Sequence, residues 1–396
     1  MGIQGLTKLI SDNAPGAIKE GTVDKYFNRK IAIDASMSIY QFLIAVRSMD
    51  AAGGGSMQLT NDAGEVTSHL TGMLYRTIKM LEAGIKPVFV FDGKAPTMKG
   101  GELAKRKERQ KAAEDELAKL QQEGSGATAE DIERQQKRLV RASREQSEEV
   151  KQLLRLMGVP VLDAPCEAEA TCAALAKAGK VFATGTEDAD ALTFGTPILL
   201  RHLNAAESRK LPIVEVNLEA ALAGLHLTHA QFIDLCILCG CDYTDSIKGI
   251  GPVTALKLVR EHGSIEEILK KLDKDKYTLP EPFPFAEARQ LFVQPDVIDV
   301  EAPECDFKWT DCDADGLRKY LVEEKQFGEE RINKAIERLQ KCRGKSSQGR
   351  LDTFFKVLAP TPKTDAGKGK QMPVVGKGKH KMGAASSSNA AKKMKK

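Results

Sequence analysis

The 396-residue sequence lacks any apolar run that approaches the roughly 20 residues needed to span a membrane, so we expect no membrane insertion. Its first residues, MGIQGLTKLI, lack a basic segment followed by an apolar stretch, which argues against secretion. Leu6 stands where a myristoylation signal needs Ser or Thr. The eight cysteines are scattered, which is typical of reduced intracellular thiols rather than a disulfide framework.

The small net charge of +4 hides an uneven distribution. Residues 345–396 contain 13 Lys or Arg against two acids, a net charge of +11, so the preceding 344 residues carry −7. This tail is rich in Lys, Gly, Ala and Ser, and it cannot bury enough apolar surface to offset the entropy of ordering. We therefore predict a folded core over residues 1–344 and a disordered tail over residues 345–396.

Within the core, short β-branched or aromatic runs alternate with longer amphipathic stretches. This alternation predicts an α/β fold with a central, mostly parallel sheet flanked by helices. The predicted strands are residues 31–34, 88–91, 181–184 and 198–200, and the clearest predicted helices are residues 68–83 and 166–178.

Two segments interrupt the alternation. Residues 50–64 are rich in Gly and Ala, which predicts a flexible loop. Residues 99–150 are almost entirely charged or helix-forming, with a break at residues 124–126. We interpret this segment as two exposed helices that form a hairpin rather than as part of the core.

Seven acidic residues stand at the ends of predicted elements. Four follow strands, and the carboxyl ends of parallel strands line the ligand crevice of such a sheet. Two stand in the first helical turn after Pro165, and one follows a helix stop at Gly240. The seven are Asp34, Asp92, Glu167, Glu169, Asp188, Asp190 and Asp242.

So many carboxylates can share one pocket only with counter-cations, because like charges otherwise raise each other's pKa until some are protonated. Oxygen-only ligands suit Mg²⁺ or Mn²⁺. Two such ions can activate a water and stabilise the leaving oxygen of a phosphodiester. Any one of these acids alone is more often a cap, a turn residue or a surface charge, but their recurrence at strand ends favours a shared metal site.

A basic run follows Asp92 and offers two interpretations. It is either a solvated helix face, since acids are interspersed, or a group that holds a scissile phosphate beside the acidic pocket. The run consists of Lys99, Lys105, Arg106, Lys107, Arg109 and Lys111.

Seven motifs, spread over essentially the whole core, give the chain a specific resemblance. They are MGIQGL (1–6), IAIDAS (31–36), VFDGKAP (90–96), CEAEA (166–170), TEDADAL (186–192), CGCDY (239–243) and GIGP (249–252). In these motifs the sequence resembles the flap endonucleases, the structure-specific 5′ nucleases of the XPG superfamily. The resemblance implies a PIN-like nuclease core and a 5′ flap endonuclease with 5′–3′ exonuclease activity, in lagging-strand maturation and long-patch base excision repair.

The resemblance also implies roles for individual residues. Lys99 and Arg106 match the family's catalytic basic positions, and the segment 99–150 matches its arch, through which a 5′ single strand passes. The acids are divided between two Mg²⁺ ions, for which Mn²⁺ can substitute. Asp34, Asp92, Glu167 and Glu169 serve one ion, and Asp188, Asp190 and Asp242 help to hold the other.

DNA contacts are implied outside the carboxylates as well. The family pattern places them at Gly2, Tyr40, Arg47, Gly249 and Gly251. Without the resemblance, the sequence around Tyr40 predicts a core residue. A helix–two-turn–helix element at about residues 228–262 would grip the duplex through backbone N–H groups. Its bound K⁺ matches Ser246, Ile247 and Ile250.

Two alternatives to a flap endonuclease stay open from the residues alone. One is a related exonuclease or junction-resolving nuclease, which the compact 99–150 segment disfavours. The other is a non-catalytic, clamp-tethered DNA scaffold, which is disfavoured because all seven positions are still acids.

The tail contains the pattern QxxLxxFF at residues 348–355. One helical turn would gather its apolar groups into a plug for a partner's pocket. The pattern resembles the PCNA-interacting peptide, which docks on the trimeric sliding clamp, and its matching residues are Gln348, Leu351, Phe354 and Phe355. A basic cluster at residues 392–396 reads as a nuclear address. We expect a monomer in the nucleus, with the nucleolus and the mitochondrion as further sites.

Overall fold

The computed structural model describes residues 2–50, 67–121, 128–203, 205, 211–273 and 275–345. The predicted loop beyond residue 50, the break at residues 124–126 and the tail motif at residues 348–355 lie outside the described residues.

Seven strands form one sheet in the order β1-β7-β6-β5-β2-β3-β4. The neighbours from β6 to β4 pair in parallel, and β7 pairs antiparallel with both β1 and β6. The predicted α/β fold with a mostly parallel sheet is therefore confirmed. The strands are β1 (Ile18–Gly21), β2 (Lys30–Asp34), β3 (Lys86–Phe91), β4 (Val161–Asp163), β5 (Ala183–Gly185), β6 (Ile198–Arg201) and β7 (Ile213–Asn217).

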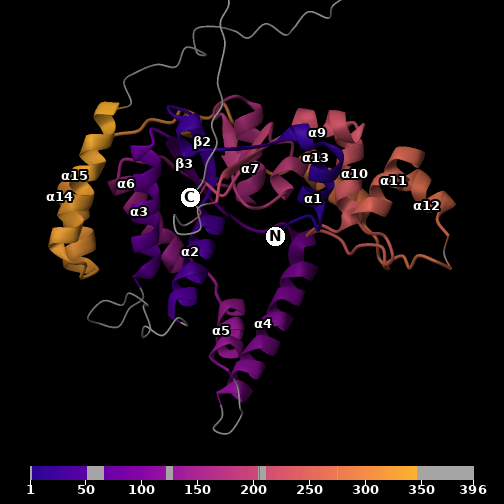
Figure 1. The fold of residues 1–396 in the computed structure, drawn as a ribbon, viewed down its shortest axis with the longest axis horizontal. Helices are drawn as coiled ribbons and strands as arrows, with labels where there is room; N and C mark the ends of the chain where they lie inside the picture. The colour runs from indigo at the N-terminus through magenta and orange to yellow at the C-terminus, as the bar shows by residue number, and fades with distance from the viewer. Residues whose placement is uncertain are drawn as a thin grey trace, which may run out of the picture. The chain divides into compact units, whose positions relative to one another are not determined.

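Helices cover both faces of the sheet (Figure 1). They are α1 (Leu6–Asn13), α2 (Ala35–Asp50), α3 (Ser68–Glu82), α4 (Gly100–Leu120), α5 (Ala129–Arg138), α6 (Arg144–Leu156), α7 (Ala168–Lys177), α8 (Asp190–Thr193), α9 (Leu218–Leu225), α10 (His229–Cys239), α11 (Pro252–His262), α12 (Ile265–Lys271), α13 (Phe285–Val293), α14 (Ala314–Arg318) and α15 (Glu329–Lys345).

The central strands are buried on both faces, which explains their continuous apolar sequences. In β2, Ile31 and Ile33 enter a core shared with α2, α3, α6 and α15. Ala32, between them, enters a second core that includes α7. This alternation follows from the two-residue period of a strand. It fixes the register of the strands, and with it the edge of the sheet where their carboxyl ends meet.

The predicted hairpin within residues 99–150 is present but shorter than predicted. Helices α4 and α5 extend from the body as two adjacent arms (Figure 1). The prediction was wrong beyond Arg138, because Ser143 caps a new helix, α6, with a capping box. Val150 and Leu153 of α6 are fully buried in the core, so residues 144–150 do not belong to the exposed arm.

Helices α10 and α11 form the predicted two-helix element at residues 228–262. Helix α10 ends at Cys239, where Gly240 adopts a φ of 102°, and Gly251 precedes α11 with Pro252 at its first position. No single described helix is long and apolar enough to cross a membrane, and α9 with α10 meets that criterion only as a pair bent by 82°.

Candidate active site

The carboxyl ends of β2, β3 and β5 bring the first acids to one edge of the sheet. Asp34 is the last residue of β2, and it stands opposite Val90 in β3, two residues before Asp92. Strand β5 lies on the other side of β2, and the chain after it carries Asp188 and Asp190. Parallel pairing therefore makes neighbours of acids that are more than 150 residues apart in sequence.

The start of α7 is held against the end of β3. Asp92 Oδ1 accepts a hydrogen bond of 2.8 Å from the backbone N–H of Ala168, an otherwise unpaired donor of the first helical turn. Gly93 permits this approach, because a Cβ atom there would overlap the carbonyl oxygen of Ala164. Glu167 occupies the N-cap position of the same helix and Glu169 lies in its first turn, so both are placed at the site by the helix start.

Asp34 is only 2% exposed, and two hydrogen-bond donors hold its carboxylate. The N–H of Met37 donates to Oδ1 at 2.9 Å, and the Thr186 hydroxyl donates to Oδ2 at 3.0 Å. Burial, followed by the charge of Asp92, raises the pKa of Asp34 to about 7 despite these donors. Thr186 also accepts from the N–H of Asp188 at 3.2 Å, so one hydroxyl links the two strand ends.

The raised pKa values of two further acids reflect the repulsion among the carboxylates. Burial, and then the charges of Asp34 and Asp92, raise the pKa of Glu169 well above its ordinary range. Burial, and then Asp188 and Asp242, do the same for the pKa of Asp190. The protein thus holds its acids at a cost in free energy that bound cations would offset.

Two basic side chains from the arm enter this acidic region. The Lys99 ammonium forms ion pairs with Glu167 and, at 3.1 Å, with Asp242. The Arg106 guanidinium donates to Asp242 at 2.8 Å. Burial opposes the charge of Lys99, but Glu167 and Asp242 outweigh it and raise the pKa of the ammonium. The structure therefore brings both predicted basic residues to the carboxylates, and neither side chain stands on a fully solvated helix face.

A third donor, which the sequence did not single out, is the hydroxyl of Tyr243. It donates a hydrogen bond to Glu167, and burial followed by the Glu167 charge raises the pKa of the phenol. Its position directly after Asp242 was the one available signal.

The N-terminal segment reaches the same acids. The N–H of Ile3 donates to Asp190 Oδ1 at 3.0 Å across 187 positions of sequence. Gly2 has a φ of 75°, and a Cβ atom there would overlap the Oδ1 atoms of Asp188 and Asp190. Only glycine fits this position, because both the backbone conformation and the space exclude a side chain.

The donor set suits divalent cations such as Mg²⁺, because all seven side chains offer oxygen. No group of three His, Cys, Asp or Glu side chains in the described ranges stands in finished metal-binding geometry. The conformations explain this, since Glu167 and Asp242 are turned to Lys99 and Arg106. The residues thus fit a divalent-metal site whose ligands need side-chain rotation.

The remaining predicted DNA and K⁺ positions lie in α2 and in the segment that leads into α11. Tyr40 is half-buried against the core of α2 and α3, and the backbone of Arg47 lies in α2 while its side chain is not described. Gly249 has a φ of 91° and is exposed near the start of α11, where Gly251 is the N-cap.

The three predicted K⁺ ligands surround one turn. Ser246 is exposed, whereas Ile247 and Ile250 are buried. The N–H of Ile250 donates to the carbonyl of Ile247 at 3.1 Å, which closes the turn just before α11. The geometry leaves the cation assignment a prediction.

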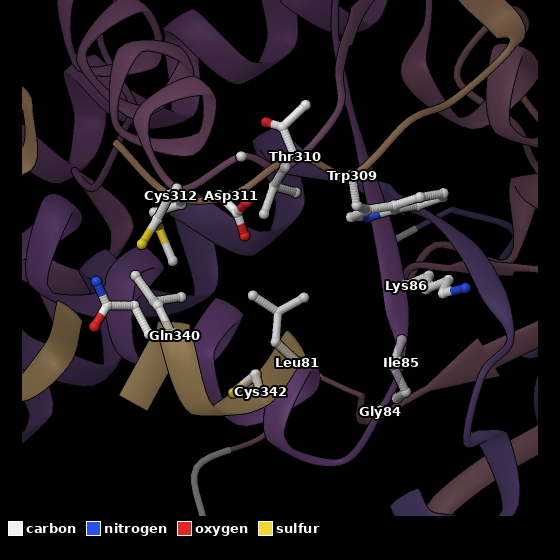
Figure 2. A pocket seen from close by; sticks show the side chains of 14 residues that line it. Leu81, Gly84, Ile85, Lys86, Trp309, Thr310, Asp311, Cys312, Gln340 and Cys342 are labelled. Carbon is white, nitrogen blue, oxygen red and sulfur yellow. The ribbon is translucent and has the colours of Figure 1, made fainter. Parts of the chain in front are cut away.

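A separate cavity of about 260 Å³ lies at the ends of the strands that are opposite to the carboxylates (Figure 2). Lys86, the first residue of β3, lines it, whereas Asp92 follows the other end of the same strand. Trp309, Cys312 and Cys342 also border the cavity. None of the seven acids lines it.

Two family matches cover the sequences that build the carboxylate site. The XPG N-terminal domain matches residues 1–113, and the XPG I-region matches residues 158–242. Together these ranges contain all seven acids, so the fold and the site define an XPG-class protein.

Curated relatives narrow the class. Flap endonuclease 1 of Danio rerio is 57% identical over 357 residues, which are 90% of this chain and 91% of the relative. Flap endonuclease 1 of Xenopus tropicalis is 54% identical over 395 residues, which are 100% of this chain and 99% of the relative. The chain belongs to the flap endonuclease 1 family.

A solved structure agrees with this placement. The flap endonuclease-1 of Methanococcus jannaschii is 29% identical with a TM-score of 0.64, over 87% of this chain and 100% of that one.

Proposed function

We propose that this protein is a Mg²⁺-dependent, structure-specific 5′ flap endonuclease with 5′–3′ exonuclease activity on branched DNA. The observation that carries the proposal is the meeting of seven carboxylates with the cations of Lys99 and Arg106 at one sheet edge. Two divalent cations would supply an activated water and neutralise charge on the scissile phosphate. Lagging-strand maturation and long-patch base excision repair are the processes that require this cut.

The chain's own residues would bind and orient the phosphodiester. Lys99 and Arg106 project from the arm into the acidic site, where positive charge stabilises a developing phosphorane. The exposed N–H groups at the start of α11 suit a backbone phosphate without reading a base. We propose that the turn with Ser246, Ile247 and Ile250 binds K⁺ beside that phosphate.

The test of this function is a panel of labelled DNA substrates in Mg²⁺. We expect a 5′ flap to be cut at its base, and to be cut faster than a nicked duplex or a four-way junction. The reason is that a flap combines a branched duplex with a 5′ single strand that can enter the arm. Cleavage should stop when EDTA removes the metal. A faster cut of the four-way junction, or cleavage that persists in EDTA, would contradict the proposal.

We further propose that residues 348–355 tether the enzyme to the PCNA sliding clamp. In this proposal the enzyme acts as a monomer and works in the nucleus. Support comes from the sequence, in which Phe354 and Phe355 are the only aromatic residues after residue 345 and fit the spacing of a short helical plug.

Replacing Phe354 and Phe355 by Ala should weaken clamp binding at least about 30-fold, because each substitution removes apolar contact worth about 1–2 kcal/mol of binding free energy. Isothermal titration calorimetry with the purified clamp measures the loss. Cleavage of free flap DNA should remain unchanged, since the substitutions lie outside the core. Unchanged clamp affinity would eliminate this segment as the tether.

A further inference from the structure

Tyr243 connects the carboxylate site to the aromatic core beneath it. The side chain is only 5% exposed, and its ring centroid lies 4.9 Å from that of Phe292 in a tilted arrangement. Phe292 packs in turn on Phe194 at 5.1 Å, and both are buried. Three interlocked rings leave Tyr243 little rotational freedom, so its hydroxyl is a donor with a fixed position.

This fixed donor contacts one oxygen of one site acid. The Tyr243 hydroxyl donates to Oε2 of Glu167, and the Lys99 ammonium pairs with Oε1 of the same carboxylate. The two partners differ in kind. Tyr243 is neutral and locked in the core, whereas Lys99 is a charged, flexible side chain from the arm.

We propose that Tyr243 is a positioning residue, which holds Oε2 of Glu167 so that Oε1 is the oxygen presented to a divalent cation. The proposal rests on the proposed function of this site as a metal-dependent nuclease centre. A neutral donor suits the task, because it fixes the carboxylate without adding a positive charge that would repel the metal. Lys99 occupies Oε1 in the described conformation and can exchange that contact for another.

The test removes the hydroxyl and keeps the ring. In Tyr243→Phe, Glu167 loses its fixed partner, and donors of this kind typically govern metal affinity by 10–100-fold. We expect Mn²⁺ binding, followed by the electron paramagnetic resonance signal of free Mn²⁺, to weaken about tenfold. The Mg²⁺ concentration for half-maximal flap cleavage should rise by a similar factor, with most of the rate recovered at saturating Mg²⁺.

Tyr26→Phe provides a matched control. Tyr26 is 1% exposed, and its hydroxyl donates to Glu215 at 2.8 Å, so the same substitution deletes the same kind of buried bond. Glu215 lies in β7, outside the seven acids. Tyr26→Phe should therefore leave Mn²⁺ affinity and the Mg²⁺ midpoint within twofold of wild type, even if its melting temperature falls.

A double-mutant cycle with Glu167→Gln tests whether Tyr243 acts through Glu167. Adding Tyr243→Phe to Glu167→Gln should cost no further Mn²⁺ affinity, because the oxygen to be positioned no longer carries the charge. The proposal is overturned if Tyr243→Phe binds Mn²⁺ like wild type, if Tyr26→Phe weakens binding equally, or if the cycle is additive. A wild-type protein that fails to cut flaps would refute the nuclease function alone, since the Mn²⁺ comparison needs no DNA.

Discussion

Replacing Asp190 by Ala should reduce flap cleavage by about a thousandfold or more, which corresponds to about 4 kcal/mol of lost transition-state stabilisation. Asp190 is 7% exposed and interacts electrostatically with both Asp188 and Asp242, so it joins the two acids at the second predicted metal position. Single-turnover cleavage of a labelled 5′ flap in saturating Mg²⁺ measures the effect. Asp245→Ala is the control, because Asp245 is an exposed neighbour that pairs with Lys105.

The same position should show the opposite effect on stability. Burial and the Asp188 charge raise the pKa of Asp190, so the folded protein holds its proton more tightly than the unfolded chain does. The free energy of unfolding therefore falls as the pH rises from the ordinary pKa of Asp through the raised one. Asp190→Asn removes this cost and retains an oxygen for the Ile3 N–H. In EDTA at neutral pH the melting temperature of Asp190→Asn should exceed that of wild type. For the cleavage test described first, equal rates for Asp190→Ala and wild type would refute the assigned site.

The parts of the fold that were predictable are those buried on two sides. Strands β2 and β3 have continuous apolar sequences because helices cover both of their faces. Strand β1, with sequence IKEG, is exposed at the sheet edge, and β4 has only three residues. Their apolar patterns are too short to separate from loops, so pairing with neighbours rather than local sequence defines them.

The candidate site divides in a similar way. Its acids were predictable because each stands near the start or the end of an element, and parallel pairing brings the strand ends together. The contacts among them were not predictable. The Ile3 N–H reaches Asp190 and the Tyr243 hydroxyl reaches Glu167 across long stretches of sequence, with no spacing that indicates either bond. Lys99 and Arg106 stood out from the other basic residues of the arm only through the family resemblance.

Lys99→Met should slow flap cleavage by about 100- to 1,000-fold, the usual effect of deleting one charge-stabilising donor. Affinity for flap DNA, measured by fluorescence anisotropy in Ca²⁺, should change only a few fold. The reason is that the Lys99 ammonium is largely buried among acids and does not belong to an exposed DNA-binding surface. Lys107→Met is the matched control, since Lys107 is an exposed lysine in α4, the helix that begins directly after Lys99. An equal loss of rate in both variants would assign the effect to general electrostatic attraction by the arm.

Thermal stability separates the roles of Lys99 and Asp190. The pKa of Lys99 is raised because Glu167 and Asp242 outweigh the effect of burial, so its charge stabilises the folded state below the ordinary lysine pKa, and hence at neutral pH. Removing that charge leaves the acids facing one another. Lys99→Met should therefore melt below wild type in EDTA, whereas Asp190→Asn melts above it, although both lose cleavage. Saturating Mg²⁺ should narrow the deficit of Lys99→Met, because a divalent cation supplies the missing positive charge. Shifts of the same sign in the two variants would contradict an acidic site that is balanced by cations.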